Sequence, residues 1–252
     1  MMYPWLERPF KRLIERGQAL PHGLLLTGPK GIGKFLLAHE VARSLLCPVS
    51  ENGPGCNECQ GCHLFDAGTH PDYHLLVSEQ TVEAGESSLV TPGERYLVNA
   101  DGRASDCAKP KSVIGVNQAR ALTEELRSTP HYAVGKVVVI YPADELNVNA
   151  ANALLKVLEE PPENTHFLLV TGALYALPAT IRSRCSHYRL PLPIESDALL
   201  WLETELSLSN EESKKLLEFS NGSPLDAYKL FDEDAWLTGA SLPGDLVAIF
   251  TD

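Results

Sequence analysis

Four cysteines in the first quarter of the chain have the spacing of a metal site. They are Cys47, Cys56, Cys59 and Cys62. Clustered cysteines in a reducing compartment usually bind metal rather than form disulfides, and four thiolates are what a closed tetrahedral zinc site needs. Glycines at 53, 55 and 61 let the backbone turn between them. Because no coordination position is left open, the sequence predicts a structural Zn²⁺ rather than a catalytic one.

Other interpretations of this cluster stay open. The four thiols could remain reduced on a surface loop, or His63 or His70 could replace one cysteine, although His63 directly follows Cys62. The segment 57–61 carries no Lys or Arg to meet phosphate, which argues against a DNA-reading finger. Cys107 and Cys185 stand apart and are interpreted as ordinary free thiols.

A glycine-rich segment has the spacing of a phosphate-binding P-loop. Its backbone amides would wrap the phosphates and its lysine would reach the terminal ones, while a following Ser or Thr would hold Mg²⁺. The chain has Phe35 at that last position. The cradle residues are Gly28, Gly31, Gly33 and Lys34. The sequence therefore predicts descent from a nucleotide-binding fold, with ATP or ADP bound weakly or not at all; a turn without any ligand is the alternative.

The second element of nucleotide hydrolysis is also altered. An apolar strand at 137–140 should be followed by acidic residues that orient metal and water, but Tyr141 and Pro142 follow it. Asp144 and Glu145 lie two or three positions later, and a shift of one residue moves a carboxylate by ~3 Å. We expect these acids to begin the next helix and the chain not to hydrolyse ATP. An active ATPase that uses Asp144 or Glu145 is the rival interpretation.

Short apolar runs alternate with helical patterns and predict the elements that would position these residues. Parallel strands joined by helical crossovers indicate an α/β fold with a three-layer sheet. The predicted strands are 23–27, 73–77, 137–140, 167–171 and 187–190, and the predicted helices are 5–18, 34–46, 116–127 and 147–159.

Two further regions have a different character. Residues 78–112 have no regular period and predict an exposed insertion with partial strand character at 96–98. Beyond Pro193 three short helices are expected, at 197–205, 210–220 and 224–231, with Ser209 and Glu212 forming a capping box. The predicted domains are an α/β domain at 1–191 with a zinc loop at 47–69, a helical lid at 192–238, and the start of a truncated further domain at 239–252.

Bulk composition limits the function classes. The chain has 252 residues, a hydrophobic fraction of 44% and a net charge of -12. No apolar run reaches the roughly 18 residues of a membrane span, and no signal peptide is recognised, so a cytoplasmic protein is expected. This negative net charge is compatible with binding to other proteins. It argues against a zinc-containing DNA-binding module, which is the least favoured alternative.

Several motifs together resemble one family. The zinc knuckle precedes Thr69-His70-Pro71-Asp72, and a helix ends in Leu158-Glu159-Glu160-Pro161-Pro162 after the run Asn152-Ala153-Leu154-Leu155-Lys156. The segment Ile181-Arg182-Ser183-Arg184-Cys185 follows. In this order the motifs resemble the AAA+ clamp-loader subunits of bacterial DNA polymerase III, over residues 3 to about 231.

The resemblance implies a role within a complex. Motor subunits of the family keep the P-loop hydroxyl, the acidic pair and an arginine in the lid, whereas this chain has Phe35, Tyr141 and apparently Leu225. It therefore resembles the stationary, non-hydrolysing member of a hetero-pentameric ring with gamma/tau-type ATPase subunits and a delta subunit. Such a ring loads the sliding clamp onto primed DNA for the DNA-directed DNA polymerase. Contact of this subunit with clamp and DNA would be indirect, and the isolated chain is not expected to be catalytic.

The resemblance also assigns a role to Arg184. It would enter the ATP site of a neighbouring motor subunit as an arginine finger, whose permanently charged fork stabilises the transferred phosphoryl group. The alternative is a helix-terminal residue bound to carbonyls or carboxylates of its own domain. Arg182 is expected to be structural. The carboxylates of Glu159 and Glu160 are expected to be solvated or paired at a helix end rather than catalytic.

Overall fold

The computed structural model describes the chain except for residues 1, 51–52, 84–91, 98–110, 133 and 233–252. Two compact units are present. Among the described residues, one contains residues from 8–27 and 34–190, and the other contains residues from 2–7, 28–33 and 191–232. Cys107 and the predicted segment 239–252 lie outside the described residues. No helix in the described part of the chain is long and apolar enough to cross a membrane.

The larger unit is built on a five-stranded sheet in the order β2-β3-β4-β1-β5. Every neighbouring pair is parallel, with Leu25 opposite Leu169 and Val138 opposite Phe167. The strands are β1 (Gly23–Thr27), β2 (Tyr73–Leu76), β3 (Lys136–Ile140), β4 (Thr165–Val170) and β5 (Ser186–Arg189). The parallel α/β sheet predicted from the apolar runs is confirmed.

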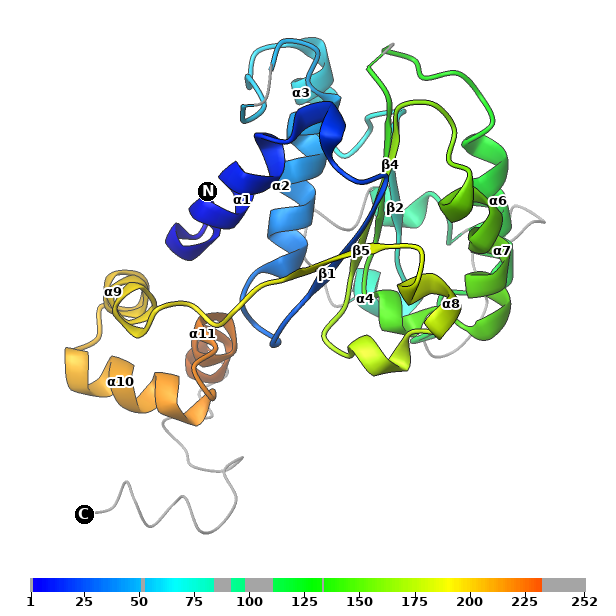
Figure 1. Ribbon diagram of the computed structural model, residues 1–252. Helices are drawn as coiled ribbons and strands as arrows, with labels where there is room; N and C mark the ends of the chain where they lie inside the picture. Colours follow the sequence, from blue (N-terminus) through cyan, green and yellow to red (C-terminus); the bar gives the residue numbers. More distant parts are fainter. Residues whose placement is uncertain (1, 51–52, 84–91, 98–110, 133, 233–252) are drawn as a thin grey trace. The chain divides into compact units, whose positions relative to one another are not determined.

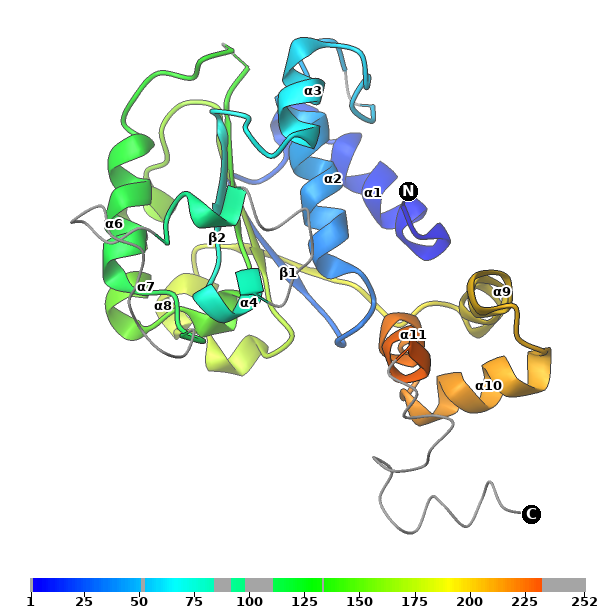
Figure 2. The same cartoon turned by 180° about the vertical axis from the view of Figure 1, so that it is seen from behind.

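Helices cover both faces of this sheet, as Figures 1 and 2 show from opposite sides. On one face lie α1 (Glu7–Ile14) and α2 (Lys34–Leu46). On the other face lie α6 (Val116–Glu125), α7 (Val148–Glu159) and α8 (Ala179–Arg182). This unit also contains the short helices α3 (Gln60–Asp66) and α4 (Glu79–Glu83), and single 3-10 turns at Gly17–Ala19, Ala143–Glu145 and Leu174–Ala176.

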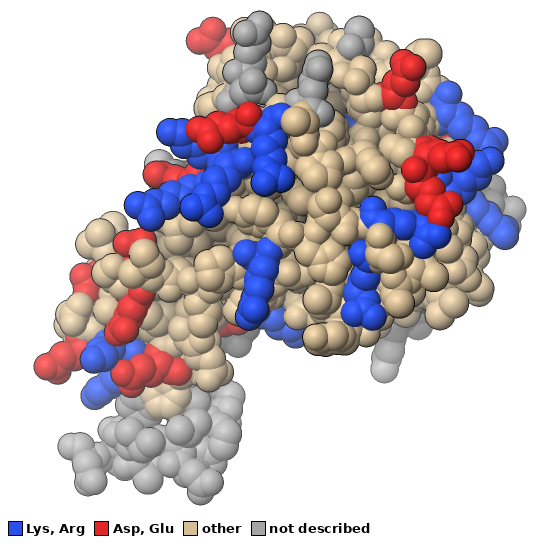
Figure 3. All heavy atoms as spheres, in the orientation of Figure 1, with Lys and Arg blue, Asp and Glu red and all other residues tan. Residues whose placement is uncertain are grey.

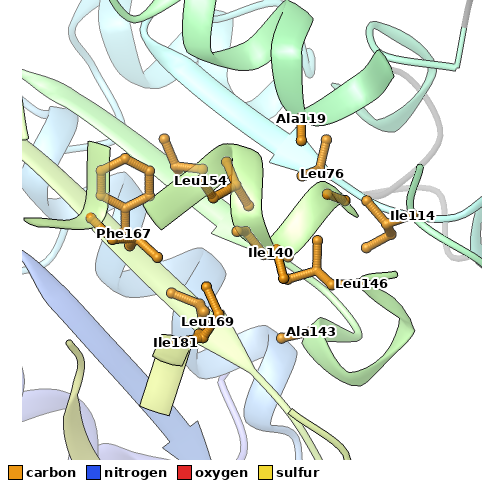
Figure 4. Close-up of a cluster of buried hydrophobic side chains, with 14 of the residues drawn as sticks. Leu76, Ile114, Ala119, Ile140, Ala143, Leu146, Leu154, Phe167, Leu169 and Ile181 are labelled. Atoms are coloured by element: carbon orange, nitrogen blue, oxygen red, sulfur yellow. The ribbon is translucent and has the colours of Figure 1, made fainter. Parts of the chain in front are cut away.

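The core of the larger unit lies between the sheet and α6 and α7 (Figure 4). Ala119 of α6 points toward Leu76 of β2. Leu154 of α7 clusters with the strand residues Ile140, Phe167 and Leu169, and all six are fully buried. Burial of such side chains stabilises each by roughly 1.5–3 kcal/mol relative to an exposed state. The strands and the crossover helices are therefore held rigidly, which fixes the chain segments that follow each strand.

The described residues of the smaller unit form three α-helices, as expected from the sequence. They are α9 (Glu195–Leu206), α10 (Asn210–Phe219) and α11 (Pro224–Asp232), and they pack through Ala198, Leu202, Leu216, Leu217 and Ala227. The predicted capping box is confirmed, because Ser209 Oγ accepts from the Glu212 amide and Glu212 reaches back to the Ser209 amide. In the same unit the 3-10 turn Pro4–Leu6 brings Trp5 edge-on to Trp201, with ring centroids 5.4 Å apart.

The structure departs from the sequence expectations in the first helix and in the predicted insertion 78–112, where the helix α4 forms at Glu79–Glu83. The predicted helix 5–18 is broken, since α1 ends at Ile14 and Gly17 has a φ of 47°, which a continuing helix cannot contain. The expected strand at 96–98 is wrong for its described residues, which form a turn at 95–97. Tyr96 is only 3% exposed, and its hydroxyl lies 2.6 Å from His74 Nδ1 and 2.7 Å from Glu125 Oε2. Part of the predicted insertion thus packs into the core.

Candidate functional site

The cysteine cluster is assembled by two helix ends. Cys47 follows the last residue of α2, Cys59 is the N-cap of α3, and Cys62 lies in the first turn of α3. The four Sγ atoms all lie within 4.8 Å of one another, with 3.9 Å between those of Cys47 and Cys59 and 3.9 Å between those of Cys56 and Cys62. A tetrahedral Zn²⁺ with Zn–S bonds of ~2.3 Å requires sulfurs ~3.8 Å apart. The geometry fits a four-coordinate ion.

Backbone amides point at these sulfurs. The amide of Cys56 donates to Cys47 Sγ at 3.4 Å, that of Cys59 to Cys56 Sγ at 3.3 Å, and that of Cys62 to Cys59 Sγ at 3.3 Å. Hydrogen bonds from the amides of Glu58 and Cys59 lower the pKa of Cys56 to about 6, while burial raises the pKa of Cys62 to about 12. Metal binding must displace the Cys62 proton, so affinity should fall at acid pH.

The histidines near this cluster are not among its ligands. The only group of metal-ligating side chains within reach of one another in the described ranges consists of the four cysteines. His70 is 2% exposed, and its Nδ1 accepts from the Asp72 amide at 3.1 Å. An ion pair next to the cluster links α2 to α3. Arg43 Nη2 lies 2.7 Å from Asp66 Oδ2.

The glycines of the P-loop-like segment contact the start of α11, within the smaller unit. Ser223 Oγ donates to the carbonyl of Lys30 at 3.1 Å, and the Leu225 amide donates to the carbonyl of Gly31 at 3.0 Å. A Cβ added at Gly31 would lie 2.5 Å from the carboxylate of Asp226. A negative charge at this distance from the loop opposes the approach of a polyphosphate.

The two positions expected to handle magnesium are occupied by aromatic rings in contact. Phe35, at the start of α2, is 7% exposed, and its ring centroid lies 4.8 Å from that of Tyr141, directly after β3. The ring of His39 is also close to Phe35, with 5.8 Å between the ring centroids. Lys34 is 8% exposed. Neither aromatic side chain offers a carboxylate, the protein ligand through which Mg²⁺ is usually bound.

The nearest acids begin a helical turn, as expected from their place in the sequence. Asp144 and Glu145 belong to the 3-10 turn after β3. Thr171 donates a short hydrogen bond to Asp144, and Thr81 Oγ1 donates to Glu145 Oε2 at 3.4 Å. Both carboxylates therefore have partners within their own unit.

Arg184 lies between the end of α8 and the start of β5. Its Nε donates to Glu159 Oε1 at 2.6 Å, its Nη2 donates to the same oxygen, and its Nη1 donates to the carbonyl of Thr180 at 2.8 Å. The side chain is 30% exposed. The own-domain contacts considered as the alternative for Arg184 are thus present, and Glu159 is paired, as expected for a carboxylate at a helix end. The sequence did not indicate that these two residues are partners.

Arg182, expected to be structural, lies over the ring of Tyr175, with 5.6 Å between the guanidinium carbon and the ring centroid. Tyr175 itself is 88% exposed. Arg182 thus faces a different neighbour from Arg184, although the two arginines are separated by a single serine.

Comparison with known proteins agrees with this arrangement. Residues 5–193 match a family model described as DNA polymerase III, delta subunit. The subunit delta' of Escherichia coli K12 is 36% identical over 93% of this chain and 62% of its own length. That of Pseudomonas aeruginosa is 38% identical over 91% of this chain and 61% of its own. The gamma subunit of a Buchnera aphidicola strain is 29% identical over 84% of this chain and 51% of its own.

The fold is shared with a solved motor protein. A point variant of Thermotoga maritima RuvB is 18% identical and has a TM-score of 0.51, over 89% of this chain and 59% of that one. This likeness supports the expected AAA+ fold and nothing finer. The chain spans about three-fifths of the length of the curated relatives it matches. It belongs to the DNA polymerase III delta-subunit family, and the two relatives named above from Escherichia coli and Pseudomonas aeruginosa are delta' subunits.

Proposed function

We propose that this chain is a non-hydrolysing stator of a clamp loader, which serves the nucleotide of a neighbouring ATPase subunit and turns over none of its own. The observation that carries the proposal is the contact between Phe35 and Tyr141, 4.8 Å apart. Mg²⁺ needs near-octahedral oxygen coordination and keeps several waters. Two packed rings at the positions of its usual ligands offer it neither a carboxylate nor space for its waters.

The finger role of Arg184 is the second part of this proposal. A guanidinium is permanently charged, and its planar fork matches the geometry of a phosphoryl group. Arg184 sits at a chain segment fixed by buried neighbours, and its side chain remains 30% exposed. An arginine finger is worth about 10³–10⁵ in rate where it has been dissected. The gamma/tau-type subunits are the partners that would receive it, and a delta subunit, the sliding clamp and primed DNA complete the proposed assembly.

The four cysteines are proposed to hold a structural Zn²⁺. Four sulfur ligands close the coordination sphere, so the ion would activate no water and would act by joining the end of α2 to α3. The amide donors to Cys47, Cys56 and Cys59 orient these ligands, as second-sphere groups do at other metal sites.

The rival functions have weaker support. An ATPase based on Asp144 would need this carboxylate at the metal, whereas it accepts a hydrogen bond from Thr171. For a DNA-binding module, Figure 3 shows one group of basic side chains over α1, where Arg8, Lys11 and Arg12 lie. Elsewhere on that face the charges are mixed, and the chain as a whole has a net charge of -12.

Nucleotide binding tests the stator proposal. The full-length chain is titrated with ATP in the presence and absence of Mg²⁺ by calorimetry, with a motor subunit as positive control. We expect no magnesium-dependent binding and no phosphate release, because Phe35 and Tyr141 fill the metal positions. Magnesium-dependent binding comparable to that of the motor subunit, with turnover by the isolated chain, would instead establish an active ATPase.

A further inference from the structure

Arg184 is held on two sides by acceptors of its own unit. A guanidinium has five N–H donors in a fixed planar fork. Nε and Nη2 share the side edge of that fork and both donate to Glu159 Oε1. Nη1 donates backward to the carbonyl of Thr180 at 2.8 Å, with a weaker contact of 3.4 Å to Ser183 Oγ. Three of the five donors are therefore oriented by the chain itself.

The remaining edge of the fork is the outer one. It consists of one N–H of Nη1 and one of Nη2, which point away from the side-chain stem. In the described part of the chain, the one further acceptor close to Nη1 or Nη2 is Ser183 Oγ, at 3.4 Å from Nη1. Two parallel N–H groups at the end of the fork are the pair that binds two oxygens of one phosphate.

Both ends of the Glu159–Arg184 pair are anchored in the core. Glu159 ends α7 directly after Leu158, which is fully buried, and Arg184 directly precedes Cys185, which is 8% exposed. Ile181 fixes α8 and is also fully buried. The carboxylate is itself half exposed, at 48%, so the pair contributes little to stability. Its rigid supports suit a role in orientation better.

We propose that Glu159 is a positioning residue for the arginine finger. It fixes the side edge of the Arg184 fork in one rotamer. The outer edge therefore already faces the phosphates of the neighbouring subunit. This inference rests on the proposed finger role of Arg184. It assigns to Glu159 a function that is separate from its place in the helix: it touches neither nucleotide nor metal and acts only through Arg184.

The expected effect on kcat and KM depends on the stage of the reaction at which an arginine finger acts. Arg184 would interact with charge that develops in the transition state, so a loss of its orientation lowers kcat and leaves KM nearly unchanged. A displacement of about 1 Å in a positioned group can cost about 10²-fold in rate. A side chain that only stabilises the fold would alter assembly or thermal stability and would not separate kcat from KM.

The test uses full-length chains assembled with motor and delta subunits, in which DNA-stimulated ATP turnover is measured. Glu159→Ala should lower the Arg184-dependent part of kcat by about 10-fold or more, with KM changed less than about twofold. Glu159→Gln should retain most of that rate, because the amide oxygen still accepts from the fork. Glu160→Ala is the matched control, since it removes the same charge one position later, and it should have no effect.

The combination with Arg184→Ala separates the two proposals. If Arg184→Ala lowers turnover and the double variant with Glu159→Ala is no slower, Glu159 acts through the finger. If Arg184→Ala lowers turnover but Glu159→Ala matches or exceeds the parent, the positioning role is wrong and the finger stands. If Arg184→Ala has no effect, the finger proposal itself fails. Should Glu159→Ala not assemble, Glu159→Asp, which withdraws the carboxylate by one methylene, replaces it with the same expected loss.

Discussion

His39 is a partly buried histidine that packs against Phe35 and has a strongly shifted pKa. Its ring lies between those of Phe35 and Phe65, and its Nδ1 is 3.1 Å from the hydroxyl of Tyr73. Burial, reinforced by the positive charge of Arg43, lowers the pKa of His39 from 6.5 to about 4. Burial among these aromatic rings therefore keeps the imidazole neutral at neutral pH.

This pKa shift makes stability depend on pH. Between pH 6.5 and 4 the unfolded chain binds a proton at His39 and the folded chain does not, so the stabilisation is complete above pH 6.5 and is lost as the pH falls. We expect the free energy of unfolding to drop by about 2 kcal/mol between pH 7 and 5 from this group. Urea unfolding of the parent and of His39→Gln measures it: the variant should have the flatter pH dependence, and equal slopes would contradict the assignment.

At the scale of elements, the zinc loop depends on α3. This helix has only seven residues, and its N-cap is the ligand Cys59. A helix of this length is not stable alone in water, so its order must come from tertiary contacts, to which the proposed ion would add. Metal removal should therefore unfold α3 locally and leave the parallel sheet in place.

Metal content and thermal unfolding test this dependence. The purified chain should contain one Zn²⁺, and a strong chelator should lower Tm and increase amide exchange in the segment from Cys47 to Asp66. Cys59→Ser should have the same effect because it removes one of four ligands. Cys185→Ala changes a buried thiol outside the cluster and should keep the metal. Stoichiometric zinc in Cys59→Ser, or an unchanged Tm after chelation, would refute the proposed site.

The elements that could be predicted from sequence are those with a strong local signal. Continuous apolar runs indicated the central strands, because parallel strands are buried on both faces. The Ser209–Glu212 box was recognisable because its two partners are three residues apart. By contrast, α3 has no apolar periodicity. Its N-cap, Cys59, is a residue type that the sequence suggests as a metal ligand rather than as a helix cap. The break after Ile14 depends on the positive φ of Gly17.

The candidate site was predictable in its residues but not in its contacts. The cysteines and the Arg184 motif are visible as spacing along the chain, and Phe35 and Tyr141 as departures from an expected pattern. That the two rings touch, and that Glu159 meets Arg184 from 25 residues away, depends on how β3, α7 and α8 pack. Periodicity carries no information about such long-range pairs.

At the scale of the whole molecule, the chain combines a rigid α/β unit with a helical unit and a net charge of -12. The residues of the P-loop-like segment are divided between the two units, since Gly28–Gly33 groups with the helical unit and Lys34 with the sheet. The proposed activity needs neither part of this segment. It needs Arg184, which lies on the sheet unit, and a neighbour that holds the nucleotide.

A comparison of two variants tests this division most directly. Lys34→Ala removes the P-loop lysine of this chain, and Arg184→Ala removes the proposed finger; each is placed in the full-length chain, assembled with motor and delta subunits, and checked for assembly. DNA-stimulated ATP turnover should remain at the parent level with Lys34→Ala. With Arg184→Ala, ATP turnover should fall toward the rate contributed by the ATP sites of the complex that Arg184 does not enter. The opposite pattern, with loss for Lys34→Ala and none for Arg184→Ala, would show that the chain uses a nucleotide of its own and would contradict the account.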